Sequence, residues 1–586
     1  MRQKISLIVL STLRAAHAQH PNPSPSPSPY VMNWSTQSYG PDGPWQAVTI
    51  QVGSNKQHIA LYPGANYAST IFADSICDNT TLSETCYAAR AGIYNQSQST
   101  TSTSLDQDGS LSSSSAPWNV FYWNVQGGSR QASIGDQVTL TNGGETAMSI
   151  PNVSFTTVYD TYQTYPNGRS YPVSVGYLAL GAPWTRDTSS SSGLTLNMMA
   201  AWLYTSNRIP SYSYALHIGS VHPPIPGSLV LGGYDRARLI GQASSQPLLD
   251  SAGLLQIVLR DIGLGVAEGG SPFPSFTDSH RGGLFLDDQH ATGAGGMALP
   301  RLVSVDPTKP YMYLPEATCN AITALFPPGY TNLTSSPAYL SFTFNKDESS
   351  SSTNNVTIRV PLQLLTLTLQ EPLVNIGDRN LTYFPCFLST DTPVLGRAFL
   401  QAAFMEVNWF EGENNGSWTI GQAPGPRLTG GEDIVAVAVN DRSLRGSEEK
   451  GAWEGSWSGY WTPLPLAGQS TGNGTDMSRS DSSLSTGAKA GIGIGVGIAG
   501  VILIGMGCWV MVLRRRRQKQ NQAGIDIAHG TGGLGTGAKS SGQAFRELPV
   551  RDKDISMQST PMELTTKDTR HPQEIMGTER VQHELE

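Results

Sequence analysis

Short runs of alternating apolar and polar residues fill the chain between residues 30 and 428. Clear examples are residues 46–52, 137–140, 255–259 and 356–360, and Gly, Pro, Asn and Ser break up the sequence between such runs. A period of two is the pattern of a strand with one buried face, and those four residue types favour turns. The pattern therefore predicts a β-rich region over most of the chain.

Helical periodicity is scarce. Only residues 194–203 and 316–325 have the apolar spacing of a helix. Of 586 residues, 62 are glycine and 38 are proline, and only 14% are charged, which is unlike a helical bundle or a coiled coil. We predict the all-β fold class for the body of the protein.

The charge of the chain is acidic and uneven. The formal net charge is −8, and between residues 19 and 513 there are 22 basic and 35 acidic residues, a charge of −13. A nucleic-acid-binding protein needs a positive surface to neutralise phosphates. We therefore expect no nucleic-acid partner.

The N-terminus has the form of a signal peptide. Arg2 and Lys4 precede the apolar run 5–13, and Ala16-His17-Ala18 has the small-x-small pattern of a signal-peptidase site. Residues 1–18 are the predicted signal peptide. Residues 19–29, in which proline alternates with small polar residues, are a predicted extended spacer.

Residues 490–513 contain no charged side chain and are long enough as a helix to cross a bilayer. The four arginines at 514–517 follow directly, and positive charge favours the cytoplasmic side. The sequence predicts a single transmembrane helix with the C-terminus inside, in the plasma membrane or a secretory-pathway membrane.

The segments on either side of this span are polar. Residues 429–489 are rich in Gly, Ser and Thr and are a predicted stalk, and residues 514–586 are a predicted disordered cytoplasmic tail. Within the span, Gly491 and Gly495 have the G-x-x-x-G spacing that lets two helices approach closely. A helix-mediated homodimer is one interpretation of that spacing, and the other is that glycine is simply common in such spans.

N-x-S/T sequons occur before the predicted span and not after it. Because glycans are added on the lumenal side, this distribution favours a glycosylated extracellular or lumenal body. The candidate sites are Asn33, Asn79, Asn95, Asn152, Asn332, Asn355, Asn380, Asn415 and Asn473.

Five cysteines are present, of which Cys508 lies in the predicted span. The other four are Cys77, Cys86, Cys319 and Cys386, and four cysteines allow three pairings. No cluster of His or Cys has metal-ligand spacing. We predict neither a metal nor another cofactor.

Four segments, in this order, together resemble the pepsin-type aspartic endopeptidases. They are Val175-Gly176-Tyr177-Leu178-Ala179-Leu180-Gly181, Gly227-Ser228-Leu229-Val230-Leu231-Gly232-Gly233-Tyr234-Asp235, Pro393-Val394-Leu395-Gly396-Arg397-Ala398-Phe399-Leu400 and Ser417 to Ala423. The resemblance implies a bilobal pepsin-like fold, with an N-terminal lobe at 30–240 and a C-terminal lobe at 241–428. It also implies one disulfide in each lobe, Cys77 with Cys86 and Cys319 with Cys386.

The resemblance implies two catalytic carboxylates, one from each lobe, that share a proton. The family writes each as Asp-Thr-Gly or Asp-Ser-Gly. Residues 57–66 lead to Cys77 at the family's spacing, which places Gly64-Ala65-Asn66 at the first motif. Gly64 has no carboxylate, so the first catalytic motif is degenerate.

The second motif is partly kept. Residues 303–315 resemble the second loop and place Asp306 in the catalytic position, followed by Pro307 and Thr308 in place of the hydroxyl residue and glycine. The family's hydroxyl residues brace the two loops, and neither Ala65 nor Pro307 has a side-chain donor. The flap of the family corresponds to residues 121–129, where Tyr122 is nearest in kind to the flap tyrosine.

A single carboxylate has no second acid with which to share a proton, and this chemistry depends on that sharing. We therefore predict a proteolytically impaired, membrane-tethered ectodomain that binds a peptide or protein ligand or acts as a sensor. Two alternatives stay open. One is an active, atypical aspartic endopeptidase rescued by Asp74 or Asp78 near the first loop, and the other is an adhesive or structural surface glycoprotein.

Overall fold

The structure, a computed structural model, describes residues 26–465 with several internal gaps. All of the described residues belong to one compact unit. The gaps are 79, 82, 106–111, 115–128, 142–146, 165–169, 185, 189–194, 249–252, 274–278, 287–300, 328–334, 348–353, 375–380, 390–391, 410–415, 429–430 and 448–450.

A six-stranded sheet joins the two halves of this unit. Its order is β1 (Tyr30–Val31), β16 (Ser228–Leu231), β15 (Ser213–His217), β29 (Ala403–Asn408), β30 (Ser417–Gln422) and β18 (Ile240–Pro247). In the middle, β15 and β29 are antiparallel, with Tyr214 opposite Val407, and every residue of both strands is buried. The sheet therefore takes one central strand from each half of the chain.

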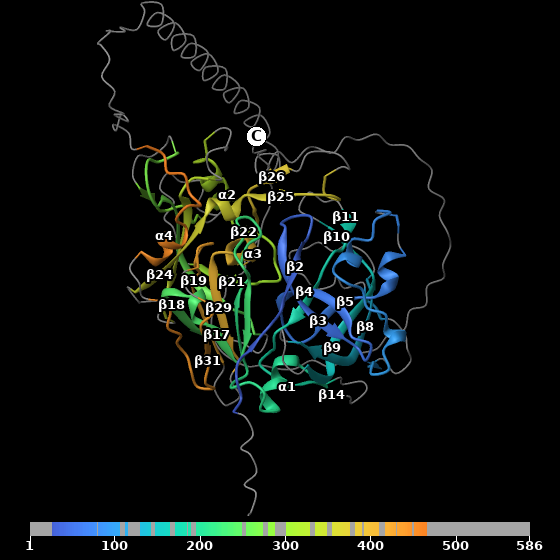
Figure 1. Cartoon of the computed structure of the whole chain (residues 1–586). Helices are drawn as coiled ribbons and strands as arrows, with labels where there is room; N and C mark the ends of the chain where they lie inside the picture. Colours follow the sequence, from blue (N-terminus) through green and yellow to red (C-terminus); the bar gives the residue numbers. More distant parts are fainter. Residues whose placement is uncertain are drawn as a thin grey trace, which may run out of the picture. The chain divides into compact units, whose positions relative to one another are not determined.

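The N-terminal half forms an eleven-stranded sheet, whose blue and teal strands lie on the right in Figure 1. Its main path is β13 (Arg186–Thr188), β14 (Thr195–Asn197), β9 (Met148–Asp160), β5 (Ser69–Phe72), β12 (Gly176–Ala179), β4 (Gln57–Ala65), β3 (Trp45–Val52), β8 (Ser129–Leu140) and β6 (Thr103–Ser104), with β2 (Trp34–Tyr39) on β3 and β7 (Ser112–Ser114) on β8.

The C-terminal half forms an eight-stranded sheet, green to yellow on the left in Figure 1. Its path is β24 (Asn355–Pro361), β23 (Ala338–Asn345), β19 (Gln256–Val266), β21 (Arg301–Val305), β28 (Val394–Leu395), β22 (Met312–Leu314) and β27 (Cys386–Leu388), with β20 (His280–Arg281) on β19. Two-stranded sheets pair β10 (Tyr162–Thr164) with β11 (Ser170–Pro172), β17 (Gly233–Asp235) with β31 (Ile434–Ala436), and β25 (Leu367–Leu369) with β26 (Leu381–Tyr383).

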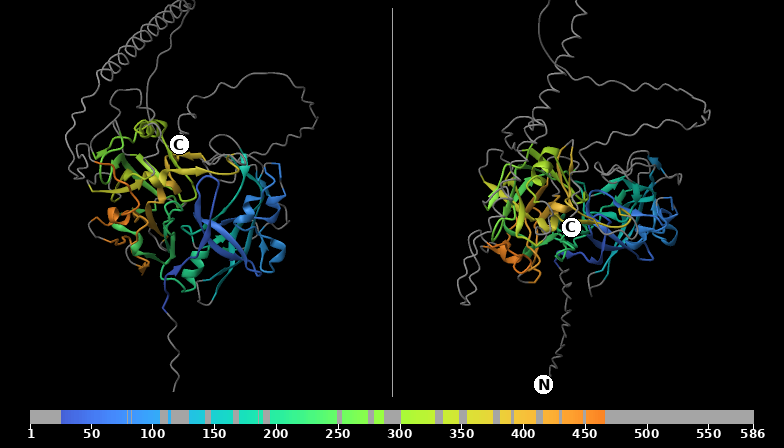
Figure 2. Two further views of the ribbon diagram at one scale, coloured as in Figure 1. Left: turned by 45° about the horizontal axis from the view of Figure 1, so that its top comes forward. Right: turned by 90° about the horizontal axis from the view of Figure 1, so that it is seen from above.

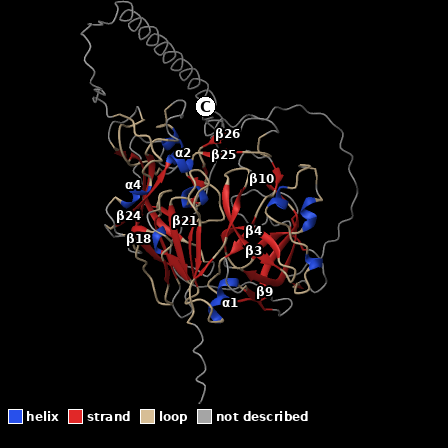
Figure 3. Cartoon of the chain, in the orientation of Figure 1, coloured by secondary structure: helices blue, strands red, loops and turns tan. Residues whose placement is uncertain are grey.

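Helices are few and short, as Figure 3 shows. In the described part of the chain they are α1 (Met199–Thr205), α2 (Glu316–Thr323), α3 (Arg397–Leu400) and α4 (Ala452–Ser456), with 3-10 turns η1 (Asp74–Cys77), η2 (Tyr87–Arg90), η3 (Gln96–Gln98), η4 (Arg236–Arg238) and η5 (Leu362–Leu365). The structure is mostly strand and agrees with the predicted all-β, two-lobed fold.

The predicted elements are largely in place. The four alternating runs lie in β3, β8, β19 and β24, and the helix predicted over 316–325 is α2. The helix predicted over 194–203 begins only at Met199, because residues 195–197 pair as β14 with β9 and β13. Pairing with distant strands has overridden the local helical pattern there.

The folded region continues past residue 428, so the predicted stalk begins too early. We call residues 431–465 the strap. β31 of the strap pairs with β17, and Trp453, Trp457 and Trp461 of the strap are buried. The three tryptophans are spaced four residues apart. Their burial stabilises the packing of this segment on the rest of the fold. The strap, in orange, lies against the C-terminal half in both views of Figure 2.

The chain ends carry predictions that fall outside the described residues. These are the signal peptide at 1–18, most of the spacer at 19–29, the stalk beyond 465, the span at 490–513 and the tail at 514–586. Between residues 26 and 465, the described residues include no helix with the length and apolarity to cross a bilayer.

Candidate functional site

The second loop begins where β21 ends. β21 pairs in parallel with β28, with Ser304 opposite Val394 and Val305 opposite Leu395. The next residue is Asp306, whose backbone N–H donates to the carbonyl of Leu395 at 3.1 Å. β21 thus places Asp306 at the start of the loop, with its side chain one-third exposed.

The first loop includes the end of β4. β4 pairs in parallel with β12, with Tyr62 opposite Tyr177 and Pro63 opposite Leu178. The next residue is Gly64, which stands in this half where the aspartate stands in the other. Neither Gly64 nor its neighbour Pro63 carries a carboxylate. If the two halves are aligned one residue earlier, the position opposite Asp306 therefore still has no acid.

The two loops touch at Gly64 and Pro307. A Cβ added to Gly64 would lie 2.1 Å from Cγ and 2.7 Å from Cβ of Pro307. Gly64 also has a φ of +122°, which residues with a Cβ rarely adopt. The proline ring of the opposite loop therefore fills the space beside Gly64, the position at which the resemblance implies the first acid, and no side chain fits there with the present backbone.

The carboxylate of Asp306 is engaged on both oxygens. Oδ1 accepts hydrogen bonds from the backbone N–H of Thr308 at 2.8 Å and from its hydroxyl at 2.6 Å. Oδ2 lies 4.0 Å from Nζ of Lys309. Among the described residues, no second carboxylate is a hydrogen-bond partner of Asp306. The family's chemistry needs a proton shared between two acids.

Two buried cations support the second loop. Lys309 is 5% exposed, and burial lowers its pKa to about 8 against the opposing effect of Asp306. Arg397 donates to the carbonyls of Pro307 at 3.3 Å and Thr308 at 2.9 Å, and its guanidinium lies 4.2 Å from the ring centre of Tyr62. Arg397 thus connects the second loop to the strand that leads into the first.

A buried acid, Asp42, lies near Arg397, and no motif in the sequence pointed to it. Asp42 is 2% exposed and accepts hydrogen bonds from Nε1 of Trp45 at 3.1 Å and from the hydroxyl of Tyr311 at 2.8 Å. The hydroxyl of Tyr383 donates to its carbonyl at 2.6 Å. Burial raises the pKa of Asp42, and the charge of Arg397 opposes that rise. These contacts join the two halves of the unit next to the loops.

The acids considered as replacements for the first catalytic residue lie elsewhere. Asp74 and Asp78 are exposed, and Oδ2 of Asp74 accepts a hydrogen bond from Asn95 at 2.6 Å. Neither is a hydrogen-bond partner of Asp306. Residues 121–128, which include Tyr122, lie outside the described residues. The described residues contain no group of three His, Cys, Asp or Glu side chains that could hold a metal ion.

The cysteines pair as the resemblance implies, one bridge in each half. Cys77 is bonded to Cys86 and Cys319 to Cys386. The second bridge ties α2 to β27, the strand next to β22, which follows the Asp306 loop. It therefore supports the structure around the second loop.

Four of the nine sequons lie in the described residues. Asn33 and Asn355 are exposed, whereas Asn95 and Asn152 are partly buried and their side-chain amides donate to Asp74 and to the carbonyl of Thr195. The remaining sequons, Asn79, Asn332, Asn380, Asn415 and Asn473, lie outside the described residues. Glycosylation stays a prediction at all nine.

A comparison with known proteins agrees with this geometry. Secreted aspartic protease 8 of Candida albicans is 26% identical over 213 residues, which are 36% of this chain and 45% of that protein. The chain thus spans less than half the length of this relative. The similarity supports the pepsin-like aspartic protease family. No family model matches the chain.

Proposed function

We propose that this protein is a membrane-anchored glycoprotein of the secretory pathway whose pepsin-like ectodomain binds a peptide or protein segment without hydrolysing it efficiently. The ligand would lie in the cleft that pepsin-like proteins have between their lobes. The cytoplasmic tail would then report binding, which makes the protein a receptor or sensor.

The contact between Gly64 and Pro307 carries this proposal. Hydrolysis by this family needs one acid to act as base on a water molecule while its protonated partner polarises the substrate carbonyl. Here the first acid is absent and its place is filled, and Lys309 and Thr308 hold Asp306. A positioned acid or base contributes about 10² to 10⁴-fold to a rate, so the loss of the pair removes most of the catalytic advantage.

The test is a proteolysis assay on the purified full-length protein. Denatured casein is incubated with it between about pH 3 and pH 6, a range that covers the loss of the shared proton, at about pH 4.7 in pepsin. We expect no cleavage that pepstatin, an inhibitor of this family, suppresses. Pepstatin-sensitive cleavage that Asp306→Asn abolishes would instead establish an active, atypical endopeptidase. In that event, loss of activity in Asp74→Asn would identify the missing acid.

Binding is measured separately, because absence of cleavage alone does not distinguish a receptor from an adhesive glycoprotein. Labelled casein peptides are titrated with the protein and followed by fluorescence polarisation, with pepstatin as competitor. Saturable binding that pepstatin displaces supports the proposal. Peptides that show no saturable binding at any pH tested contradict it and favour the adhesive alternative.

A further inference from the structure

A pocket of about 630 Å³ lies away from the two loops, under the beginning and the end of the strap. The chain passes it at residues 426–428 and again at 458–460, and Pro226 and η4 form its other wall. The volume is within the usual range for small-ligand sites, about 300–1,000 Å³. The strap lies beyond the predicted end of the C-terminal lobe at residue 428. Four of its residues nevertheless line the pocket: Gly431, Glu432, Ser458 and Tyr460.

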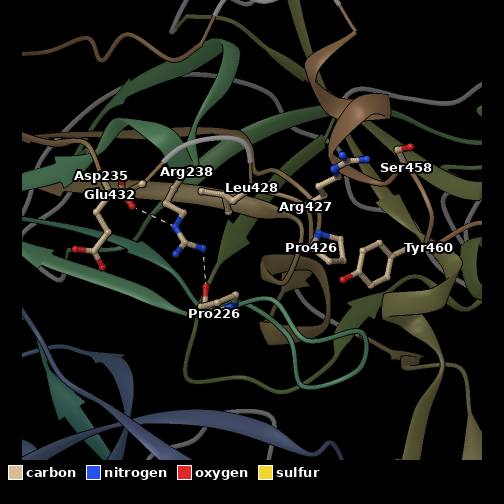
Figure 4. A pocket seen from close by; sticks show the side chains of 10 residues that line it. Pro226, Asp235, Arg238, Pro426, Arg427, Leu428, Glu432, Ser458 and Tyr460 are labelled. Atoms are coloured by element: carbon tan, nitrogen blue, oxygen red, sulfur yellow. Dashed lines mark hydrogen bonds and ion pairs between the residues drawn. The ribbon is translucent and has the colours of Figure 1, made fainter.

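A buried cation lines this pocket. Arg238 is 6% exposed, its Nε donates to Asp235 at 3.2 Å and its Nη1 donates to the carbonyl of Pro226 at 2.7 Å. These two bonds, dashed in Figure 4, use two of the five N–H donors of a guanidinium. Asp235 is already satisfied, because it also accepts from the backbone N–H groups of Ala237 and Asp433.

The mouth of the pocket carries charged and aromatic side chains that are exposed. Arg427 and Glu432 have no side-chain hydrogen bond or ion pair within the described part of the chain. Tyr460 is 38% exposed. Figure 4 shows Arg427, Ser458 and Tyr460 on one side of the pocket and Glu432 on the other, beside Asp235 and Arg238. The pocket therefore has a cationic, hydroxyl-bearing end and a carboxylate end.

We propose that this pocket binds a saccharide that carries a carboxylate group, such as a uronic acid unit. The carboxylate pairs with the guanidinium of Arg427, which suits the planar fork of arginine. The ring of Tyr460 offers a flat apolar face for the C–H face of a sugar, and the rings of Pro226 and Pro426 add apolar surface. Glu432 and Ser458 then accept hydrogen bonds from sugar hydroxyls, which an acidic peptide lacks.

Saturation-transfer NMR on the purified full-length protein tests the proposal. The probes are digalacturonic acid, the matched neutral disaccharide and the dipeptide Glu-Glu. We expect the acidic disaccharide to bind at least about tenfold more tightly than either control, the worth of one charge-assisted hydrogen bond. Arg427→Gln should weaken it by about 10- to 100-fold.

Arg442→Gln is the matched control, because Arg442 is an exposed arginine of the strap that does not line the pocket. It should leave binding unchanged. Three results would overturn the proposal. The first is no binding of digalacturonic acid up to about 10 mM, a range in which only very weak binding escapes detection. The others are an equal loss of affinity in Arg427→Gln and Arg442→Gln, or an affinity for Glu-Glu equal to that for digalacturonic acid. None of these results bears on peptide binding near Asp306, because Asp306 does not line this pocket.

Discussion

Replacing Gly64 with aspartate adds a carboxylate where the first loop lacks one, and we expect the change to destabilise the protein rather than to create a protease. A Cβ at this residue would lie 2.1 Å from Cγ of Pro307, whereas carbons in contact lie about 3.5–4.0 Å apart. Such overpacking costs about 1–3 kcal/mol. The positive φ of Gly64 adds roughly 1–3 kcal/mol for any residue with a Cβ.

The total, about 2–6 kcal/mol, is a large part of the roughly 5–15 kcal/mol that stabilises a typical protein. The assay is the thermal unfolding midpoint, followed by tryptophan fluorescence, for Gly64→Asp and Gly64→Ala. The matched control is Gly241→Ala, because Gly241 has a φ of +69° and no atom within 4 Å of an added Cβ. The control therefore has a positive φ without the contact, and its backbone cost is the smaller one because +69° lies at the left-handed region that residues with a Cβ can adopt.

We expect both substitutions at Gly64 to lower the midpoint by several degrees more than Gly241→Ala does. Adding Pro307→Ala to Gly64→Asp removes the closest carbon, and the coupling between neighbouring residues should restore about 1–3 kcal/mol. Equal midpoints for Gly64→Ala and Gly241→Ala would refute the reasoning, because they would show that the loops do not meet at Pro307.

Two further predictions concern stability. Glu406 is 2% exposed, and burial raises its pKa to about 8 from 4.5. Between these two pH values the unfolded chain has released a proton that the folded protein keeps. The free energy of unfolding therefore falls by about 1.4 kcal/mol for each pH unit in this range. Glu406→Gln should flatten this fall, measured as unfolding midpoints at about pH 5 and pH 8, and an unchanged slope would contradict the assignment. Trp457, 1% exposed and stacked on Trp461 with ring centres 5.4 Å apart, should cost about 3–5 kcal/mol when replaced by alanine and should open the strap to limited proteolysis, whereas Tyr460→Ala should do neither.

Local pattern was sufficient to predict most strands. The runs that became β3, β8, β19 and β24 alternate clearly because one face of each strand packs on a core. The strap escaped notice because the predicted stalk, residues 429–489, is rich in Gly, Ser and Thr as a whole, although the three tryptophans near its start carry the packing. Composition averages over a segment, whereas burial depends on a few large side chains.

In the candidate site too, some features could be predicted from the sequence and others could not. The spacing from Gly64 to Cys77 is short, so the sequence alone predicts which residue stands where the family has its first acid. The contact with Pro307 joins residues that are far apart in the chain and needs the fold. Asp42 lies in a Gly-Pro-Asp-Gly-Pro stretch, which is typical of an exposed turn, and it is buried by tyrosines from the other half. Lysine is rarely buried, so nothing in the sequence pointed to Lys309.

The pairing of β15 with β29 has a consequence for synthesis in the cell. Ser213–His217 leaves the ribosome long before Ala403–Asn408, and until then one edge of this strand has no neighbour. An unpaired, apolar strand edge invites association with other chains. A nascent molecule would therefore depend on chaperones until its second half arrives to complete the sheet.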